Sequence, residues 1–464
     1  MNNLSLLFQR VTGWRSFARG LTALLGFLPA GARSPGPPAG HPGKLIARSL
    51  NSNFPLAHDS YNGVSCASDG RIYYVLCTSV PDTGAQMFAY NPATEQIARL
   101  GDLTEACGEK GAGAVVQGKS HVNFIESRGK LYFSTHLGYY ANVNGREGFG
   151  PPPPGMKQYP GGHFLSYEMG SGKFEDLGID PNGGGIISMT MDPQRGRLYG
   201  LAWPSNHFLR YDLAKRELRD IGLIPGYPAD PSIFRALCRA PTVNPDDGSV
   251  YFTTVHGRII RYVYARDAME VVEGEDMKKD YFGVYDPEKP GHMGYNWRQT
   301  AWYEPDRMIY GVHGNSGYLF RFDPRAPRIE VLERITSLPS QRSGRYDQFS
   351  FGYLGFTLGP DGRTLYYLTG GPIYVNGKRV EGKATTAKGE AKGLENLHLI
   401  TFDIPTSKYT DHGAVFFENG NVPTYVNTLA VGQDGAVYAV ARPEPGNTRS
   451  DLMRIPPVIM ARQR

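Results

Sequence analysis

The stretch GRLYGLAWPSNHFLRYD, residues 196–212, decides the fold of this chain. It holds two short runs of apolar and aromatic residues with a polar turn between them, which is the pattern of a β-hairpin. The first run recurs around seven tyrosines: Tyr73, Tyr132, Tyr199, Tyr251, Tyr310, Tyr366 and Tyr438. The second run recurs after each of them, at Tyr90, Tyr167, Tyr211, Tyr262, Phe322, Phe402 and Ile455. Units of roughly 50–70 residues suit one four-stranded sheet with its loops, so the repeat predicts an all-β, seven-bladed β-propeller.

The N-terminal segment is predicted to be a secretory signal peptide covering residues 1–32. Three arginines precede an apolar run at 21–30, and the small residues 30–32 form a cleavage site of the A-x-A type. The alternative is an N-terminus without a targeting role. Residues 33–44 are rich in proline and glycine and are expected to form a flexible tether. The propeller is expected to span 45–464, with 45–50 completing the last blade, in a secreted or periplasmic protein.

The net charge limits the classes of binding partner, and the cysteine content limits the disulfide bonds. The formal net charge is +5, and residues 1–32 carry three arginines and no acidic residue, so the remainder is close to neutral. Without a long run of lysine or arginine, we expect no nucleic-acid partner, and no membrane partner once the signal is removed. The 4 cysteines are too few for a disulfide scaffold. Cys66 and Cys77 lie too far apart along one hairpin to pair, so all four are expected to be small core residues.

Histidines gather on one face of the predicted propeller. In a four-stranded meander, the connection between strands two and three lies on the same face as the connection to the next blade. Seven histidines map to that face: His121, His136, His163, His207, His256, His313 and His398. The second blade holds the first three of them. Imidazole acts as a base, an acid or a metal ligand near neutral pH, so the trio is a candidate site. Any one of these histidines taken singly is better interpreted as structural or exposed.

Aromatic residues and an arginine accompany these histidines. Arg235, Trp203, Trp297 and Tyr227 map to the same face, and an insertion at 145–162 extends the second blade there, as one at 376–396 extends the sixth. Aromatic rings stack on sugars and a guanidinium pairs with a carboxylate, which suits an acidic carbohydrate, while the alternative for the tryptophans is packing between blades. The sequence contains no nucleophile elbow, Walker loop or HExxH motif, and few carboxylates fall on this face, which argues against acid/base glycoside hydrolysis.

The stretch 117–240, which contains the three histidines of the second blade and Arg235, resembles the seven-bladed propeller polysaccharide lyases, of the ulvan-lyase type. The similarity rests on QGKSHVNF, KLYFSTHLGYY, YPGGHFLSY, RLYGLAWP and FRALCR. Such lyases cleave a uronate-containing polysaccharide by β-elimination, with a pair of histidines, a tyrosine and an arginine.

The resemblance implies catalytic roles for particular residues of this chain. The histidines would be two of His121, His136 and His163, with the last two favoured, and the arginine would be Arg235. Tyr227 is chosen as the tyrosine, because Tyr199 and Tyr211 belong to the repeat and are expected to be structural. The chemistry would need no cofactor. Relatives of this kind can carry a structural metal ion, for which the candidate ligands are Cys238, His256 and His313.

Two further functions fit the same sequence: a non-catalytic propeller that binds glycan or another protein, and a metal-dependent propeller hydrolase. The lyase hypothesis makes a geometric demand that the others do not. It requires His121, His136, His163 and Arg235 to line one pocket.

Overall fold

The computed structural model describes residues 43–143, 146–233, 235–288, 293–313, 316–338, 355–369, 374–375, 378–379, 397–444 and 447–459. The chain divides into two units, Met1–Gly40 and His41–Arg464, and all described residues belong to the second. The predicted signal peptide and most of the predicted tether lie outside the described residues, as does most of the insertion at 376–396.

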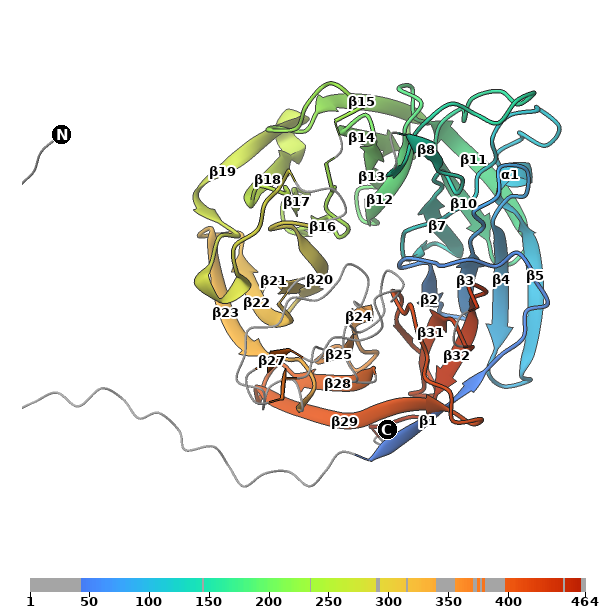
Figure 1. The fold of residues 1–464 in the computed structure, drawn as a ribbon. Helices are drawn as coiled ribbons and strands as arrows, with labels where there is room; N and C mark the ends of the chain where they lie inside the picture. Colours follow the sequence, from blue (N-terminus) through green and yellow to red (C-terminus); the bar gives the residue numbers. More distant parts are fainter. Residues whose placement is uncertain are drawn as a thin grey trace, which may run out of the picture. The chain divides into compact units, whose positions relative to one another are not determined.

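The described strands form a ring of seven four-stranded blades (Figure 1), which confirms the prediction of an all-β, seven-bladed propeller. The first strand of each blade lies nearest the centre. The first three blades, from inner to outer strand, are β2 (Val64–Cys66), β3 (Ile72–Leu76), β4 (Gln86–Asn91) and β5 (Gln96–Asp102); β6 (Ile125–Ser127), β7 (Lys130–Ser134), β10 (His163–Glu168) and β11 (Lys173–Ile179); and β12 (Gly185–Asp192), β13 (Arg197–Trp203), β14 (His207–Asp212) and β15 (Glu217–Leu223).

The remaining four blades follow the same order. They are β16 (Thr242–Val243), β17 (Val250–Thr253), β18 (Arg258–Val263) and β19 (Ala268–Asp276); β20 (Trp297–Tyr303), β21 (Met308–His313), β22 (Tyr318–Asp323) and β23 (Arg328–Arg334); β24 (Gly355–Leu358), β25 (Thr364–Thr369), β28 (His398–Asp403) and β29 (Lys408–Phe417); and β30 (Ala430–Val431), β31 (Val437–Ala441), β32 (Asp451–Ile455) and β1 (Lys44–Ser49).

The ring closes between the two ends of the described chain. Strand β1 pairs antiparallel with β32, through Ser49 opposite Met453, and so becomes the outer strand of the last blade. The beginning of β1 also runs parallel to β29, with Lys44 opposite Ala414. Closure of this kind leaves no free sheet edge at the junction. Strand β1 therefore occupies the place expected for residues 45–50.

The tyrosines of the repeat belong to the scaffold. All seven in the first phrase are buried. In three blades the phenol donates a hydrogen bond to the aspartate four residues earlier, in the turn before the strand: Tyr73 to Asp69 at 2.8 Å, Tyr310 to Asp306 at 2.5 Å and Tyr438 to Asp434 at 3.0 Å. Each of these bonds fixes a turn against the strand that follows it. Tyr199 and Tyr211 are also buried, at 0% and 2% exposure.

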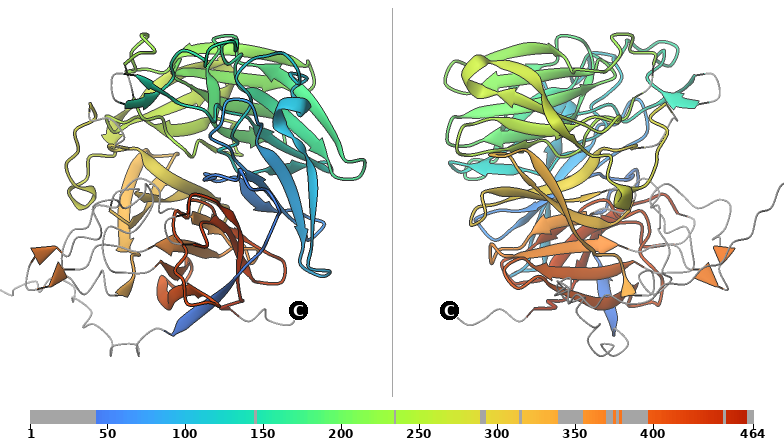
Figure 2. Two further views of the ribbon diagram at one scale, coloured as in Figure 1. Left: turned by 45° about the vertical axis from the view of Figure 1, so that its right-hand side comes forward. Right: turned by 90° about the vertical axis from the view of Figure 1, so that its left-hand side faces the viewer.

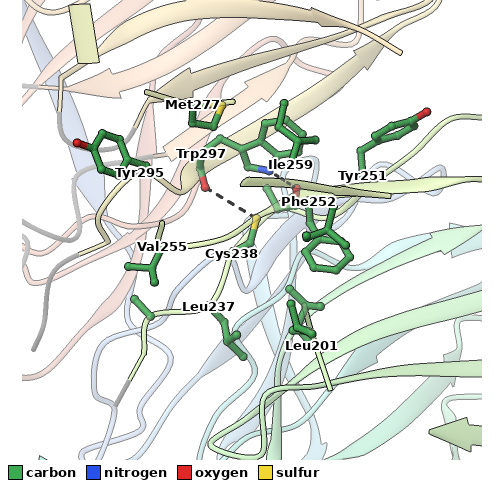
Figure 3. Close-up of a cluster of buried hydrophobic side chains, with 14 of the residues drawn as sticks. Leu201, Leu237, Cys238, Tyr251, Phe252, Val255, Ile259, Met277, Tyr295 and Trp297 are labelled. Carbon is green, nitrogen blue, oxygen red and sulfur yellow. Dashed lines mark hydrogen bonds between the residues drawn. The ribbon is translucent and has the colours of Figure 1, made fainter. Parts of the chain in front are cut away.

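Apolar cores lie between neighbouring blades. One of them spans blades three to five and contains Leu201, Phe252 and Trp297 (Figure 3). Trp297 is fully buried, and its Nε1 donates to the carbonyl oxygen of Ala240 at 3.0 Å. Packing between blades is therefore the role of Trp297, the alternative that the sequence left open.

The remaining elements are short. Two hairpins stand in the strand-two to strand-three insertions: β8 (Ala141–Val143) with β9 (Arg146–Gly148), and β26 (Tyr374–Val375) with β27 (Lys378–Arg379). Both project from the same face of the ring (Figure 2). The helical turns are α1 (Leu103–Ala106), η1 (Tyr264–Arg266) and η2 (Asp280–Phe282). In the described part of the chain, no helix is long and apolar enough to cross a membrane. All four cysteines are free, and three of them are buried.

Removing the closing strand should weaken the whole ring. A protein that begins at Leu50 instead of His41 exposes the edges of β32 and β29, and we expect its Tm to fall by roughly 5 °C or more. Thermal unfolding followed by circular dichroism checks this. Ile46→Thr is the control, because Ile46 lies on the same strand but is 47% exposed. Equal Tm values for the shortened and full chains would show that closure contributes little stability.

Candidate functional site

Three basic side chains share one face at the inner edge of blade two. Lys119 and His136 lie opposite each other, each backbone N–H donating to the other's carbonyl oxygen at 2.9 and 2.8 Å. His121 comes two residues after Lys119, so its side chain points to the same face. The rings of His121 and His136 have centroids 5.2 Å apart. Both imidazoles are buried, at 4% and 0% exposure.

His136 is held on both sides of its ring. Its Nε2 is hydrogen-bonded to the hydroxyl of Tyr140 at 2.9 Å. The ring packs edgewise against Trp203 of blade three at 5.8 Å. Its Nδ1 faces Gly185, where an added Cβ would lie only 1.9 Å from that nitrogen. Glycine at 185 therefore provides the room that His136 occupies.

Tyrosines from the junction of blades one and seven complete the cluster. Tyr61 precedes β2 and packs edgewise on His121, with ring centroids 4.7 Å apart. Its hydroxyl is hydrogen-bonded to that of Tyr425, which precedes β30. The guanidinium of Arg298, on the inner strand of blade five, lies 5.8 Å from the Tyr61 ring. The cluster thus draws on blades from all around the ring.

The cluster carries an excess of positive charge. Lys119 is 7% exposed and Arg298 is 1% exposed, while Arg239 is half-buried, with Nε and Nη1 buried and lacking a hydrogen-bond partner among the described residues. The Lys119 ammonium lies over the ring of Tyr140 at 4.6 Å. Within the described ranges, neither Lys119 nor Arg239 forms an ion pair with a carboxylate. Burial, followed by repulsion from Arg239, lowers the pKa of Arg298 to about 9. An arrangement of this kind favours an anion.

Burial and these charges together keep the two histidines neutral. Burial, then the nearby His136, Lys119 and two arginines, lower the pKa of His121 well below 6.5. Burial and then Lys119 and Arg239 lower that of His136 in the same way. His121 makes no hydrogen bond through its buried Nδ1 to the described residues. Its Nε2 is the nitrogen that can accept a proton from a ligand.

His163 does not join this cluster. Its backbone lies opposite Thr135, so its side chain points to the other face of the blade from His136. Its Nδ1 pairs with Asp176 at 2.9 Å and its Nε2 with Glu109 at 2.8 Å. Burial opposes a charge there, but the two carboxylates outweigh it and raise the pKa of His163 to about 9. With both ring nitrogens donating, this imidazolium has no free nitrogen to act as a base.

The environment of His163 is part of a repeat. In three blades a histidine that opens the third strand bonds through Nδ1 to an aspartate 13 residues later: His163 to Asp176 at 2.9 Å, His207 to Asp220 at 2.7 Å and His398 to Asp411 at 2.9 Å. The aspartate also accepts the N–H of a glycine two residues further, Gly178, Gly222 or Gly413, each with a positive φ. Three of the seven histidines on the face therefore clamp the third and fourth strands together.

Tyr227 and Arg235 are also engaged elsewhere. The Tyr227 hydroxyl donates to the carbonyl of Ala236 at 2.8 Å and accepts the N–H of Val255 at 3.0 Å. Arg235 forms an ion pair with Glu288, which also lies 3.5 Å from His256. The structure brings together two of the four residues that the lyase hypothesis placed in one pocket, His121 and His136. It places His163 and Arg235 in other contacts, so these four residues do not meet the geometric demand of that hypothesis.

The three candidate metal ligands lie in different surroundings. Cys238 is buried in the apolar core beside the carbonyl of Trp297, at 3.9 Å (Figure 3). His313 stacks on Phe282 with ring centroids 4.4 Å apart. Among the described residues, no group of three or more His, Cys, Asp and Glu side chains is placed to hold a metal ion. The metal stays a prediction from the resemblance.

Sequence reasoning missed most of the cluster. It overlooked Lys119, Tyr61, Arg239, Arg298 and Tyr425, none of which lies at a repeat position. The sequence nevertheless contained enough information to place them. Each of these residues lies at or just before the first strand of a blade, and that end of the blade is on the same face of the propeller as the histidines.

Comparison with known proteins shows the fold and nothing finer. No known family matches the chain, and no curated protein does. A chain of the Mitotic Checkpoint Complex matches with a TM-score of 0.50 and 10% identity over 94% of this chain and 99% of that one. The β-propeller domain of Cps50 (Swd1) from Myceliophteria thermophila matches with a TM-score of 0.47 and 7% identity over 88% and 99%. The extracellular domain of a putative one component system from B. thetaiotaomicron matches with a TM-score of 0.44 and 13% identity, over 88% of this chain and 39% of that one.

Gly185→Ala should disturb His136 directly. The new Cβ cannot share space with Nδ1 at 1.9 Å, so either the imidazole or strand β12 must move. We expect a loss of about 1–3 kcal/mol in the free energy of unfolding, measured by urea denaturation. Gly170→Ala is the matched control, because an added Cβ there has no neighbour within 4 Å. A loss no larger than that of the control would mean that Gly185 is not needed for this packing.

The pair of carboxylates at His163 should make stability depend on pH. The pKa of His163 is about 9 in the folded protein, above the ordinary value of 6.5, so its stabilisation is complete below pH 6.5 and is lost as pH rises through 9. We expect His163→Gln to cost of order 2–3 kcal/mol at pH 6 and much less at pH 9.5. Urea unfolding of both proteins at the two pH values measures this. A cost independent of pH would contradict the imidazolium assignment.

Proposed function

We propose that the protein is a secreted or periplasmic polysaccharide lyase that cleaves a uronate-containing chain by β-elimination at the cluster around His121. The observation that carries this proposal is the combination of two neutral imidazoles with Lys119 and Arg239, neither of which has a carboxylate partner among the described residues. The resemblance of residues 117–240 to propeller lyases implies the same chemistry, but with His163, Tyr227 and Arg235 in roles that this proposal does not give them. The substrate class is an acidic polysaccharide, and the chemistry calls for no cofactor.

β-Elimination makes three demands on a site. The carboxylate on C5 of the uronate must be neutralised, which makes the proton on C5 more acidic. A base must take that proton while the bond between C4 and the glycosidic oxygen breaks and a double bond forms between C4 and C5. An acid must protonate the departing oxygen. An excess of positive charge beside a neutral base meets the first two demands.

The residues of the cluster divide between these tasks. In this proposal the carboxylate binds to Arg239, which has two buried nitrogens without a partner among the described residues, and to Arg298. Lys119 adds charge from blade two. His121 is the base, because its imidazole is neutral and its Nε2 is not held by another residue in the described part of the chain. His136 has its Nε2 bonded to Tyr140 and its Nδ1 against Gly185, so it positions that phenol instead.

His121→Gln tests the assignment of the base. The protein is incubated with polygalacturonate, alginate, hyaluronan, heparan sulfate and ulvan, and the unsaturated product is followed by its ultraviolet absorbance. We expect activity on at least one of them and a fall in kcat of about 10²–10⁴-fold in the variant. His207→Gln is the matched control, since His207 lies on the same face but belongs to the strand clamp. Binding of a polysaccharide without unsaturated product would favour a non-catalytic propeller instead.

The charge around His121 should also set the acid limit of the reaction. A base works when neutral, and the pKa of His121 lies well below 6.5, so kcat/KM should hold to well below pH 6.5. Removing a neighbouring positive charge with Lys119→Met should raise that pKa, so kcat/KM should begin to fall at a pH closer to 6.5. The pH profile of kcat/KM for both proteins measures this shift. The same pH profile for both proteins would mean that the charge of Lys119 does not affect the pKa of the base.

A further inference from the structure

We propose that His163 is a positioning residue that holds the blade-two insertion, residues 145–162, beside the candidate site, and that it does so only as an imidazolium. The contacts that carry this inference stand without the lyase function, but their effect on turnover rests on that proposed function. Besides its clamp to Asp176, His163 pairs through Nε2 with Glu109 at 2.8 Å. Glu109 lies in the connection between blades one and two, so this contact joins the third strand of blade two to that connection.

Glu109 is hydrogen-bonded in turn to a side chain that holds the insertion. Its other carboxylate oxygen, Oε2, accepts from Nε2 of Gln117 at 2.9 Å. Gln117 is fully buried, and its Nε2 also donates to the carbonyl oxygen of Gly161 at 2.8 Å. Its Oε1 accepts from the hydroxyl of Tyr159 at 2.7 Å. Since Tyr159 and Gly161 belong to the insertion, one chain of hydrogen bonds runs from His163 to the insertion.

The backbone of the insertion is tied to the same connection. The N–H of Lys157 donates to the carbonyl oxygen of Gly113 at 2.7 Å, and the N–H of Val115 donates to the carbonyl oxygen of Lys157 at 3.1 Å. A small apolar core also joins the two segments. Its buried members are Val115, Leu137 and Tyr159, and Tyr139, Tyr140, Phe149 and Met156 pack against them. The insertion is therefore held by backbone bonds, by apolar contacts and by the chain of hydrogen bonds from His163.

Tyr140 connects this assembly to the candidate site. Its ring packs against the apolar core that contains Tyr159, and its hydroxyl is bonded to Nε2 of His136 at 2.9 Å. The Lys119 ammonium lies over the same ring at 4.6 Å. Movement of the insertion would therefore shift both Tyr140 and the cation beside the base His121.

Only a protonated ring can serve both carboxylates of His163. An imidazolium has two N–H donors, whereas a neutral imidazole has one, so after loss of the proton one ring nitrogen would face a carboxylate with a lone pair. Asp176 is fixed on strand β11, opposite Leu165, and also accepts the N–H of Gly178 at 3.0 Å. Glu109 lies in a connection without a paired strand. We therefore expect the contact with Glu109 to be the one that is lost.

The pH at which this happens follows from the groups around the ring. Burial lowers the pKa of His163, but Asp176 and Glu109 outweigh it and raise that pKa to about 9. Two further ionisable side chains share these surroundings, Cys107 and Tyr159, and burial raises the pKa of each well above its ordinary value. Both therefore stay uncharged while His163 titrates. The contact with Glu109 is complete below pH 6.5 and is lost as the pH rises through 9.

Hydrogen exchange tests this contact without any substrate. The N–H groups of Val115 and Lys157 report directly on the bonds between the connection and the insertion. Their protection, taken relative to the intrinsic exchange rate at each pH, is measured by mass spectrometry at pH 7 and pH 10. The proteins compared are the unmodified chain, Glu109→Gln and His207→Gln. The last is the matched control, because it removes a strand clamp of the same kind on blade three. Circular dichroism and Tm confirm folding of each variant.

We expect the protection of these two N–H groups to fall by about tenfold or more between pH 7 and pH 10 in the unmodified chain and in His207→Gln. Glu109→Gln removes the charge that the imidazolium binds. Its protection should already be about tenfold lower at pH 7 and should change less than threefold up to pH 10. Protection that is equal at the two pH values in the unmodified chain, or equal in Glu109→Gln and the unmodified chain, would overturn the inference.

The pH profile of kcat/KM shows whether this contact serves the site. It is measured from pH 6 to pH 10 for the same three proteins, on the polysaccharide of the panel that the unmodified chain cleaves. We expect the unmodified chain and His207→Gln to lose activity above pH 9 as protection is lost. Glu109→Gln should be about tenfold less active at pH 7 and should lack that alkaline fall, which general destabilisation would not produce.

A Glu109→Gln protein that loses protection but keeps activity within twofold at pH 7 would overturn the positioning role of His163 and leave the lyase function standing. An unmodified chain that yields no unsaturated product from any polysaccharide would overturn the lyase function. The exchange measurement would then still decide whether the imidazolium holds the insertion.

Discussion

Closure of the ring is the constraint on which the rest of the structure depends. Strand β1, from the beginning of the described chain, is the outer strand of the last blade and pairs with β32. Only with blades one and seven joined can Tyr61, which precedes β2, meet Tyr425, which precedes β30. Asp59 and Arg442 make a second contact across the same junction. One part of the candidate site is therefore built directly on the seam that completes the fold.

The fold could be predicted from the sequence because it depends on a repeat. A buried tyrosine, a turn with aspartate or glycine and a strand of buried residues recur in every blade, and each occurrence reports the same local packing. The site could be predicted only in part. His121 and His136 stood out because they interrupt the repeat at a known face. Arg298, Arg239 and Tyr61 come from blades one, four and five, and their proximity follows from the curvature of the ring, which no local pattern encodes.

The assignment of His163 is wrong for a physical reason. The resemblance favours His163 as one of the two catalytic histidines, and the predicted topology places it on the same face of the propeller as His136. The alternation of side chains along paired strands instead turns it to the other side of the blade, toward Glu109 and Asp176. The signal for this was present in the sequence as a histidine followed after 13 residues by aspartate and then by glycine, in blades two, three and six. A residue that recurs with its partner at a fixed spacing is part of the scaffold, even when its chemistry suggests catalysis.

The positive charges of the cluster carry a free-energy cost in the folded protein. Bringing Arg239 and Arg298 together out of water, with no carboxylate in reach of Arg239 among the described residues, opposes folding. A scaffold free of functional demands would place a carboxylate there, as it does for Arg442 with Asp59. An anionic ligand of the proposed class would place a negative charge beside Arg239 and would therefore bind favourably there. Burial, together with these charges, keeps His121 unprotonated. The charges that lower the stability of the folded protein would thus help to prepare a base and a carboxylate site within one cluster.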